Sequence, residues 1–254
     1  MAGSSPEVDC DCWDIDPFCR CASRLAATPC SRHAESMSKV EGTGTSFAQR
    51  ERLALADLFD ELGPEAPTLC EGWTTRDLVS HLVLREGHLA AAGIAIRPLR
   101  AWTTRIHRNL AEEPFGHVVT RFRDGPPTFS PMRLPGIQAS LSTFEHFVHH
   151  EDVRRAASTW SARELAVPDQ LTLWQQLTSR ARLLVRGAPI PVRLVGEGHG
   201  VVSVGETGLP TTLSVRGEPG ELVIYLHGRR NHAEIQVTGP EASLASWDRH
   251  VLKV

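Results

Sequence analysis

Two short segments of the sequence carry histidine and acidic residues at spacings that suit metal binding. Glu145 and His149 are four residues apart, so on an α-helix they lie on one face, roughly 5–6 Å from each other. His81 lies among apolar residues, where a buried imidazole needs a partner that offsets its lost hydration. One divalent ion could bind all three groups. Such a set leaves at least one coordination position open for water or substrate, as catalytic zinc sites do.

Spacing alone leaves other interpretations open. An E-x3-H pair on a helix usually forms a surface salt bridge, and His146 and His150 make a second pair with the same spacing. The register of the site is therefore ambiguous by one residue. Two histidines and one carboxylate also suit iron, nickel and manganese as well as zinc, so the ligand set does not identify the metal. We expect His33 and His88 to be solvated.

The helices that would position these groups have recognisable ends. Ser46 begins a capping pattern, and the apolar residues that follow it predict a helix that stops at Gly63. Thr74 or Thr75 can cap a second helix, which we expect to run to about Ala92, with Asp77 in its first turn.

Two more helical regions follow. The third covers about residues 99–124 and is interrupted at Pro114, and a Pro-rich loop comes after it. The fourth runs from about 136 to about 158, with Ile137, Leu141, Phe144, Val148 and Val153 on or near its apolar stripe. Four antiparallel helices predict a bundle at residues 46–160, and cofactor sites in bundles are made by side chains of facing helices.

The second half of the chain, residues 161–254, has a different texture. A helix is expected at 169–186 and a closing helix at about 240–250. Between them the pattern predicts short strands at 192–195, 201–204, 212–215, 222–226 and 234–237, with Gly and Pro in the gaps. The chain is therefore expected to be an α+β protein of two domains: a four-helix bundle followed by a small C-terminal α/β domain.

Residues 1–45 are expected to be a disordered leader, because they lack hydrophobic periodicity and end in a Gly/Thr-rich stretch. Five of the six cysteines are in this segment, at positions 10, 12, 19, 21 and 30. The two C-x-C pairs are similar to a zinc knuckle, but zinc-finger spacing is normally C-x2-C or wider. Met37 offers an alternative start, in which case the leader is an artefact of start-codon choice.

Composition narrows the class of protein. Lys and Arg number 27 and Asp and Glu 30, which gives a formal net charge of -3 with the two signs well mixed. No basic face is therefore prepared for nucleic acid. The sequence has neither a long apolar run nor a signal-peptide pattern, so we expect a cytoplasmic protein with no membrane partner.

The two histidine segments resemble one family. The segments Trp73–Leu82 and Glu145–Asp152 are similar to the DinB-like superfamily, in the branch that contains mycothiol-dependent maleylpyruvate isomerase. The resemblance implies that His81, Glu145 and His149 bind a divalent metal, usually zinc. The segments Phe47–Arg52 and His149–Arg155 are closer to an uncharacterised metal-binding group of this branch, and Gly220–Arg229 is similar to its C-terminal domain.

The resemblance also implies a reaction. In the isomerase, mycothiol adds to a cis double bond, the adduct rotates, and elimination gives the trans product. We therefore expect a thiol-dependent isomerase or transferase that uses mycothiol on a small electrophilic substrate. The alternative is a metal- or ligand-binding module without turnover.

Arg229 matches the arginine that the related enzymes place toward the cleft between domains, so it is the candidate catalytic residue. Its guanidinium could clamp a substrate carboxylate. The other interpretation is that Arg229 is an ordinary charged residue of a hairpin turn. We expect Cys70 to be a small packed residue, and Arg154 and Arg155 to pair with Glu151 and Asp152.

Overall fold

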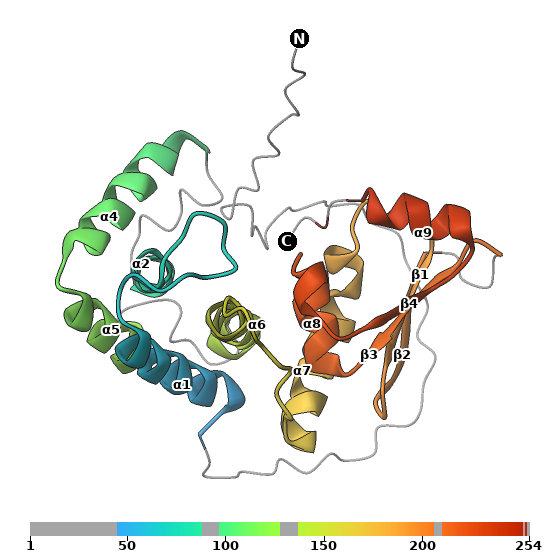
Figure 1. Cartoon of the computed structure of the whole chain (residues 1–254), viewed down its shortest axis with the longest axis horizontal. Helices are drawn as coiled ribbons and strands as arrows, with labels where there is room; N and C mark the ends of the chain where they lie inside the picture. The colour runs from blue at the N-terminus through green and yellow to red at the C-terminus, as the bar shows by residue number, and fades with distance from the viewer. Residues whose placement is uncertain (1–44, 88–96, 128–136, 206–209, 251, 253–254) are drawn as a thin grey trace, which may run out of the picture.

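The computed structural model describes residues 45–87, 97–127, 137–205, 210–250 and 252 (Figure 1). These residues form eight α-helices and one four-stranded sheet, so the predicted α+β class is confirmed. The expected leader up to residue 44, both of its C-x-C pairs, His33, His88 and most of the Pro-rich loop lie outside the described residues. None of the described helices is long and apolar enough to span a bilayer.

The first two helices begin as their capping residues predict. Helix α1 (Phe47–Leu62) is capped by Ser46, whose Oγ accepts a hydrogen bond of 3.3 Å from the Gln49 N–H. It ends at Gly63, whose φ of 76° suits glycine. Helix α2 (Thr75–Gly87) follows Thr74, whose backbone N–H and hydroxyl both donate to Asp77 Oδ2 at 3.0 Å. The contacts between Thr74 and Asp77 fix the start of α2 and therefore the position of His81 within it.

The next helices form the rest of the N-terminal helical layer. The short 3₁₀-helix η2 (Arg97–Leu99) leads into α4 (Arg100–Glu112), and α5 (Phe115–Asp124) follows Pro114. Helix α6 (Ile137–Arg154) ends four residues before the predicted end at Ser158. Helix α1 packs against α5 and α6, and α2 packs against α4 and α5. In Figure 1, α6 lies between this layer and the elements of the second half.

The second half is built around a mixed sheet. Helix α7 (Val167–Leu184) precedes strands β1 (Val192–Gly196), β2 (Gly200–Val204), β3 (Leu213–Gly217) and β4 (Gln236–Thr238), and α9 (Glu241–Asp248) follows them. The strand order is β2-β1-β3-β4, with β1 and β3 parallel and both edge strands antiparallel to their neighbours. Three of the five predicted strands lie where expected, and the last is shifted by two residues.

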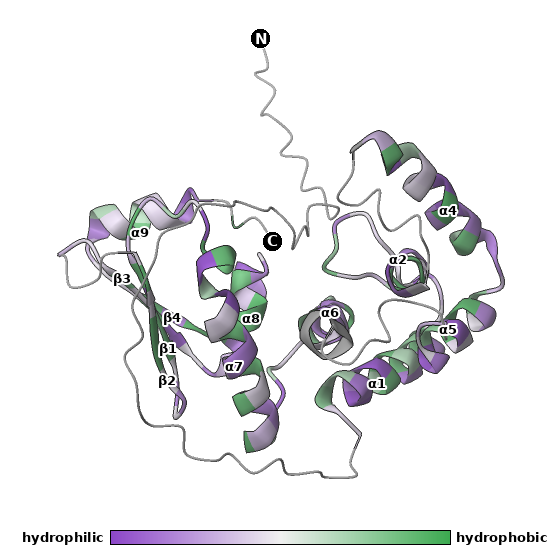
Figure 2. Ribbon diagram, turned by 180° about the vertical axis from the view of Figure 1, so that it is seen from behind, coloured by the Kyte–Doolittle hydropathy of each residue, from purple (hydrophilic) through white to green (hydrophobic). Residues whose placement is uncertain are grey.

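One predicted strand is wrong. Residues 222–226 belong to helix α8 (Pro219–Leu226), every residue of which is buried. A short run that is apolar on all sides suits a buried helix as well as a buried strand, and periodicity cannot distinguish them. Pro219 in the first turn was the available signal, because proline favours that position of a helix. In Figure 2, α8 lies between α6 and the sheet, whereas α4 lies at the outer edge of the helical layer.

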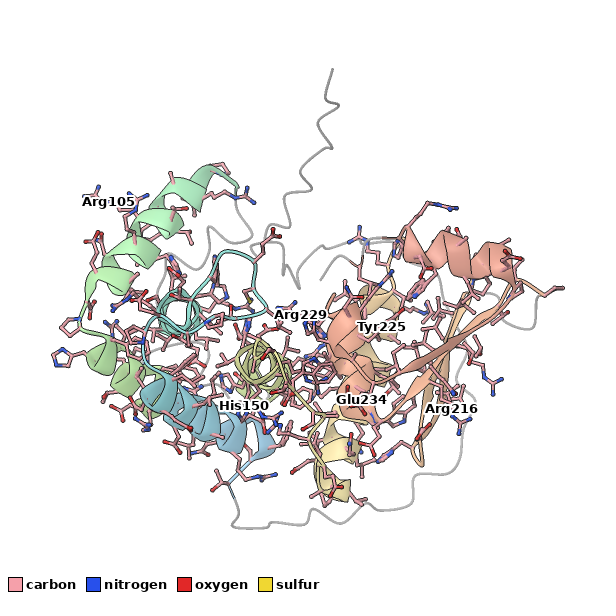
Figure 3. The ribbon with its side chains drawn as sticks, viewed as in Figure 1. Arg105, His150, Arg216, Tyr225, Arg229 and Glu234 are labelled. Carbon is pink, nitrogen blue, oxygen red and sulfur yellow. The ribbon has the colours of Figure 1, made fainter. Side chains whose placement is uncertain are left out.

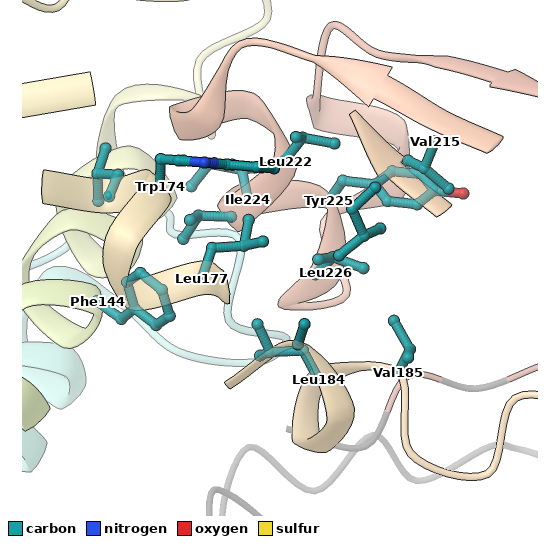
Figure 4. Close-up of a cluster of buried hydrophobic side chains, with 14 of the residues drawn as sticks. Phe144, Trp174, Leu177, Leu184, Val185, Val215, Leu222, Ile224, Tyr225 and Leu226 are labelled. Atoms are coloured by element: carbon teal, nitrogen blue, oxygen red, sulfur yellow. The ribbon is translucent and has the colours of Figure 1, made fainter. Parts of the chain in front are cut away.

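Helix α8 lies in the larger of two hydrophobic clusters. Its side chains meet those of α7, β1 and β3 around Trp174 and Ile224, and Phe144 and Phe147 of α6 reach the same cluster (Figure 4). At its far side the Trp247 indole N–H of α9 donates to the Tyr225 hydroxyl at 2.7 Å. The smaller cluster, centred on Phe59 and Phe122, takes all its buried members from residues 55–153.

Buried charges tie the helical layer to α8. The guanidinium of Arg155, one residue past α6, lies 2.5 Å from Glu151 Oε2 and 2.6 Å from Glu221 Oε1 on α8, and its side chain is fully buried. Burial alone would lower the pKa of Arg155, but its hydrogen bonds to Glu221 and the charge of Glu151 raise it above its ordinary value. Arg155 therefore stays protonated and links α6 to α8.

Replacing Arg155 by Ala should lower the free energy of unfolding by about 3–5 kcal/mol, because the buried carboxylate of Glu221 loses its cation while Glu151 keeps Arg154 and Arg163. Urea denaturation at neutral pH measures this. Arg216→Ala is the control, since Arg216 and Glu197 form an ion pair with side chains 55% and 50% exposed, and should cost at most about 1 kcal/mol. Equal small losses in the two variants would contradict the assignment.

Candidate metal centre

Helices α2 and α6 bring the three predicted ligands together. Potential ligand atoms of His81, Glu145 and His149 all lie within 4.8 Å of one another. The three residues are 1%, 8% and 3% exposed, so each polar group has given up most of its hydration. The sequence spacing anticipated this convergence for the pair on α6, and the family resemblance anticipated it for His81.

The structure removes the ambiguity of register on α6. His146 points its Nδ1 at the Ala48 carbonyl, 2.9 Å away, and its Nε2 at Glu86 Oε1, 2.7 Å away. His150 places Nδ1 2.9 Å from Glu51 Oε2 on α1 (Figure 3). The second histidine pair is thus held by carboxylates of α1 and α2, away from the three predicted ligands.

Glu145 is the most telling member of the group. Both of its carboxylate oxygens are buried, and within the described part of the chain neither accepts a hydrogen bond. Arg85 Nε lies 2.6 Å from Oε1, but the contact lacks hydrogen-bond geometry and is a close ion pair only. Buried carboxylate oxygens normally have donors or ligate a cation. This donor set therefore fits a divalent ion.

His81 is in the protonation state that a metal ion needs. Burial, followed by the electrostatic influence of His149 and Arg85, holds the pKa of His81 well below its ordinary value. The ring of Trp73 lies against His81, with centroids 5.1 Å apart, and stacks on His107 at 5.4 Å. Trp73, which lies just before α2, thus shields the imidazole of His81 from solvent. A neutral imidazole is the form that ligates metals.

His149 is oriented by a carboxylate. Its Nδ1 lies 2.9 Å from Asp152 Oδ2, so the nitrogen on the opposite side of the ring, Nε2, is left for an ion. Burial alone would raise the pKa of Asp152, but the charge of Arg229 and the hydrogen bonds from His149 and Arg229 hold it far below the usual range. Asp152 is therefore a permanent anion behind His149.

Arg229 is the partner of Asp152. Its Nε and Nη2 each lie 2.7 Å from one carboxylate oxygen, in a two-pronged ion pair. It follows helix α8 rather than a strand, and it faces α6 (Figure 3). The expectation that Arg154 and Arg155 pair with Glu151 and Asp152 is confirmed for Glu151, which binds both arginines, and wrong for Asp152, which pairs with Arg229. Arg229 is therefore not an ordinary charged residue of a hairpin turn, because its guanidinium is paired with a buried carboxylate.

Cys70 is a neighbour of the site that the sequence did not reveal. It is buried as predicted, and its Sγ lies 3.3 Å from Asp152 Oδ2 and 3.9 Å from His149 Nδ1. Cys70, His149 and Asp152 form a second group whose possible ligand atoms lie within 4.8 Å of one another. Residue 70 precedes α2 and has no spacing relationship to α6, so only the fold could join them. Asp152 had a signal, since it is three residues from His149 on one helix.

The site and its helices define a class: α+β proteins with a candidate metal centre between two helices. Residues 48–103 match a family model described as the mycothiol maleylpyruvate isomerase N-terminal domain, a segment that includes His81. The resemblance to the DinB-like and mycothiol maleylpyruvate isomerase-like superfamily is thereby confirmed. Glu145 and His149 lie beyond the matched residues. Searches of curated proteins and of solved structures found no significant match.

His227, the residue that ends α8 beside Arg229, should make folding sensitive to pH. Burial, partly offset by a 2.7 Å contact with the Val223 carbonyl, lowers the pKa of His227 from 6.5 to about 4. Between pH 6.5 and about 4, His227 is protonated in the unfolded chain but neutral in the folded chain. The free energy of unfolding is therefore highest above pH 6.5 and falls as the pH drops toward 4. The full contribution is up to about 3 kcal/mol.

Urea denaturation between pH 7 and 4 should therefore show a shallower loss of stability in His227→Gln than in the natural sequence. Glutamine keeps a donor for the Val223 carbonyl without the titration. The exposed His117, changed to Gln, is the matched control and should keep the natural slope. Parallel pH curves for His227→Gln and the natural chain would show that His227 is not buried as a neutral group.

Proposed function

We propose that this chain is a divalent-metal-binding protein whose ion is held by His81, Glu145 and His149. The observation that carries the proposal is the carboxylate of Glu145, buried between two imidazoles with no hydrogen-bond donor to either oxygen among the described residues. Three protein ligands leave a position for water or substrate. Zinc is the first candidate, and nickel, iron and manganese also suit the set.

We further propose that the centre serves a thiol-dependent isomerase or transferase that acts on a small electrophile, with mycothiol as the cosubstrate. The family match over residues 48–103 supports this class of reaction. A bound ion would lower the pKa of a thiol or polarise a carbonyl at the open position. The chain's own contribution is positional: Asp152 fixes the ring of His149, and Arg229 fixes Asp152.

The proposal includes a particular layout. The helices of residues 46–160 would form a DinB-like four-helix bundle, and residues 161–254 a separate domain that carries Arg229 to the site. The smaller hydrophobic cluster supports a core within the bundle, because its buried members all come from residues 55–153, while Phe47, Phe144 and Phe147 pack into the larger cluster with the C-terminal half. We also propose a cytoplasmic location, which is supported by the family match over residues 48–103.

A second candidate is a metal- or ligand-binding module without turnover. It is favoured by the state of the acidic groups around the site, since Asp152 is held by Arg229 and Glu86 by Arg52, with Nη2 and Oε1 2.6 Å apart. Within the described chain, these carboxylates are committed to ion pairs rather than poised to move protons.

The first test is metal content. Purified protein should contain about one equivalent of divalent metal by elemental analysis, and a His81→Ala, His149→Ala double variant should lose it, because only one ligand remains. His150→Gln, one residue along the same helix, should keep the metal. Full retention of metal by the double variant would contradict the proposed ligand set.

The second test is turnover. Metal-loaded protein should accelerate the loss of free thiol into maleylpyruvate or a model electrophile, and the metal-free double variant should not. Thiol consumption followed with a chromogenic disulfide reagent gives the rate. Stoichiometric metal with no acceleration across a broad panel of electrophiles would instead establish the second candidate.

A further inference from the structure

The charges around the candidate centre cancel before any ion is bound. Glu145 and Asp152 are two buried anions, and Arg85 and Arg229 are their two cations, at 2.6 and 2.7 Å respectively. The arginine side chains are only 12% and 18% exposed, so solvent screens them weakly. The protein alone thus presents a neutral site with two matched ion pairs.

A divalent ion changes this balance by two positive charges. Buried charge is costly unless it is compensated nearby. The other buried carboxylates of α2 and α6, Glu86 and Glu151, are already paired with arginines. The compensating charge must then come from the ligand that takes the open position. A thiolate together with an acidic group, on the same ligand or on the electrophile bound beside it, would restore neutrality.

Arg85 and Arg229 differ in how they are held. Arg229 makes two hydrogen bonds to Asp152, whereas the contact between Arg85 and Glu145 has the distance of an ion pair but not the geometry of a hydrogen bond. Arg85 is also one turn from His81 on α2, on the same face of the helix. When the carboxylate of Glu145 binds an ion, its negative charge is offset by that ion. The guanidinium of Arg85 then lies beside the centre with N–H groups that can donate to a bound anion.

We propose that Arg85 is an anion-binding residue of this centre: it balances Glu145 in the metal-free protein and holds the acidic group of the ligand once the ion is bound. The inference rests on the proposed metal site and adds the charge of the ligand to it. Its geometric basis is the close, poorly directed contact between Arg85 Nε and Glu145 Oε1.

The test uses cobalt(II) as the metal, because thiolate binding to cobalt gives a charge-transfer absorption that reports the Kd directly. The two probes are 2-mercaptoethanesulfonate and 2-mercaptoethanol, which share the thiol and differ in one negative charge. A sulfonate is a poor metal ligand, so any preference for it reflects the protein. The natural protein should bind the sulfonate about tenfold more tightly, the worth of one charged hydrogen bond.

Arg85→Gln should reduce this preference to less than about twofold, and the d–d absorption of its bound cobalt before thiol is added shows that the variant is folded and metal-loaded. Arg85→Lys should keep part of the preference. Arg123→Gln, which removes an arginine paired with Asp57 and Asp60 on the surface, should keep all of it. An undiminished preference in Arg85→Gln overturns this inference alone, whereas failure of the natural protein to bind cobalt overturns the metal site as well.

Discussion

The burial of helix α6 is the constraint on which the rest of the structure depends. From Ser142 to Val153 every residue of this helix is buried, although the segment contains three histidines and three acidic residues. Each ionisable group therefore needs a partner, and the partners come from different elements. Glu145 faces Arg85 on α2, His150 faces Glu51 on α1, and Asp152 faces Arg229 beyond α8.

This requirement fixes the assembly around α6 more specifically than hydrophobic packing does. Apolar side chains tolerate small shifts, but a two-pronged ion pair such as Arg229 with Asp152 does not. A rotation of α6 by one residue would separate Glu145 and Asp152 from their arginine partners. The same constraint orients the metal candidate, since Asp152 sets the ring of His149 and is itself set from the C-terminal half of the chain.

The sequence predicted what depends on local chemistry. Caps at Ser46 and Thr74 located α1 and α2, Pro114 separated α4 from α5, and the spacing of Glu145 and His149 placed them on one face of a helix. It failed where partners are distant. Nothing in the local pattern joins Cys70 or Arg229 to Asp152, and the apolar run of α8 has no period that separates helix from strand.

The predicted strand at 222–226 shows how one such error reaches the site. As a strand, that segment leaves two interpretations open for Arg229, a hairpin turn or a position facing the cleft between domains. As the buried helix α8, it delivers Arg229 to α6. The role of Arg229 therefore follows from the burial of α8 and not from the residues next to it.

Two groups of candidate ligands share His149, and we propose that the ion belongs to the group with His81 and Glu145. X-ray absorption at the edge of the bound metal distinguishes them most directly. Zinc held by His81, Glu145 and His149 should show a first shell of nitrogen and oxygen alone, at about 2.0–2.1 Å. A sulfur at about 2.3 Å in protein free of added thiol would place the ion on Cys70 and contradict it.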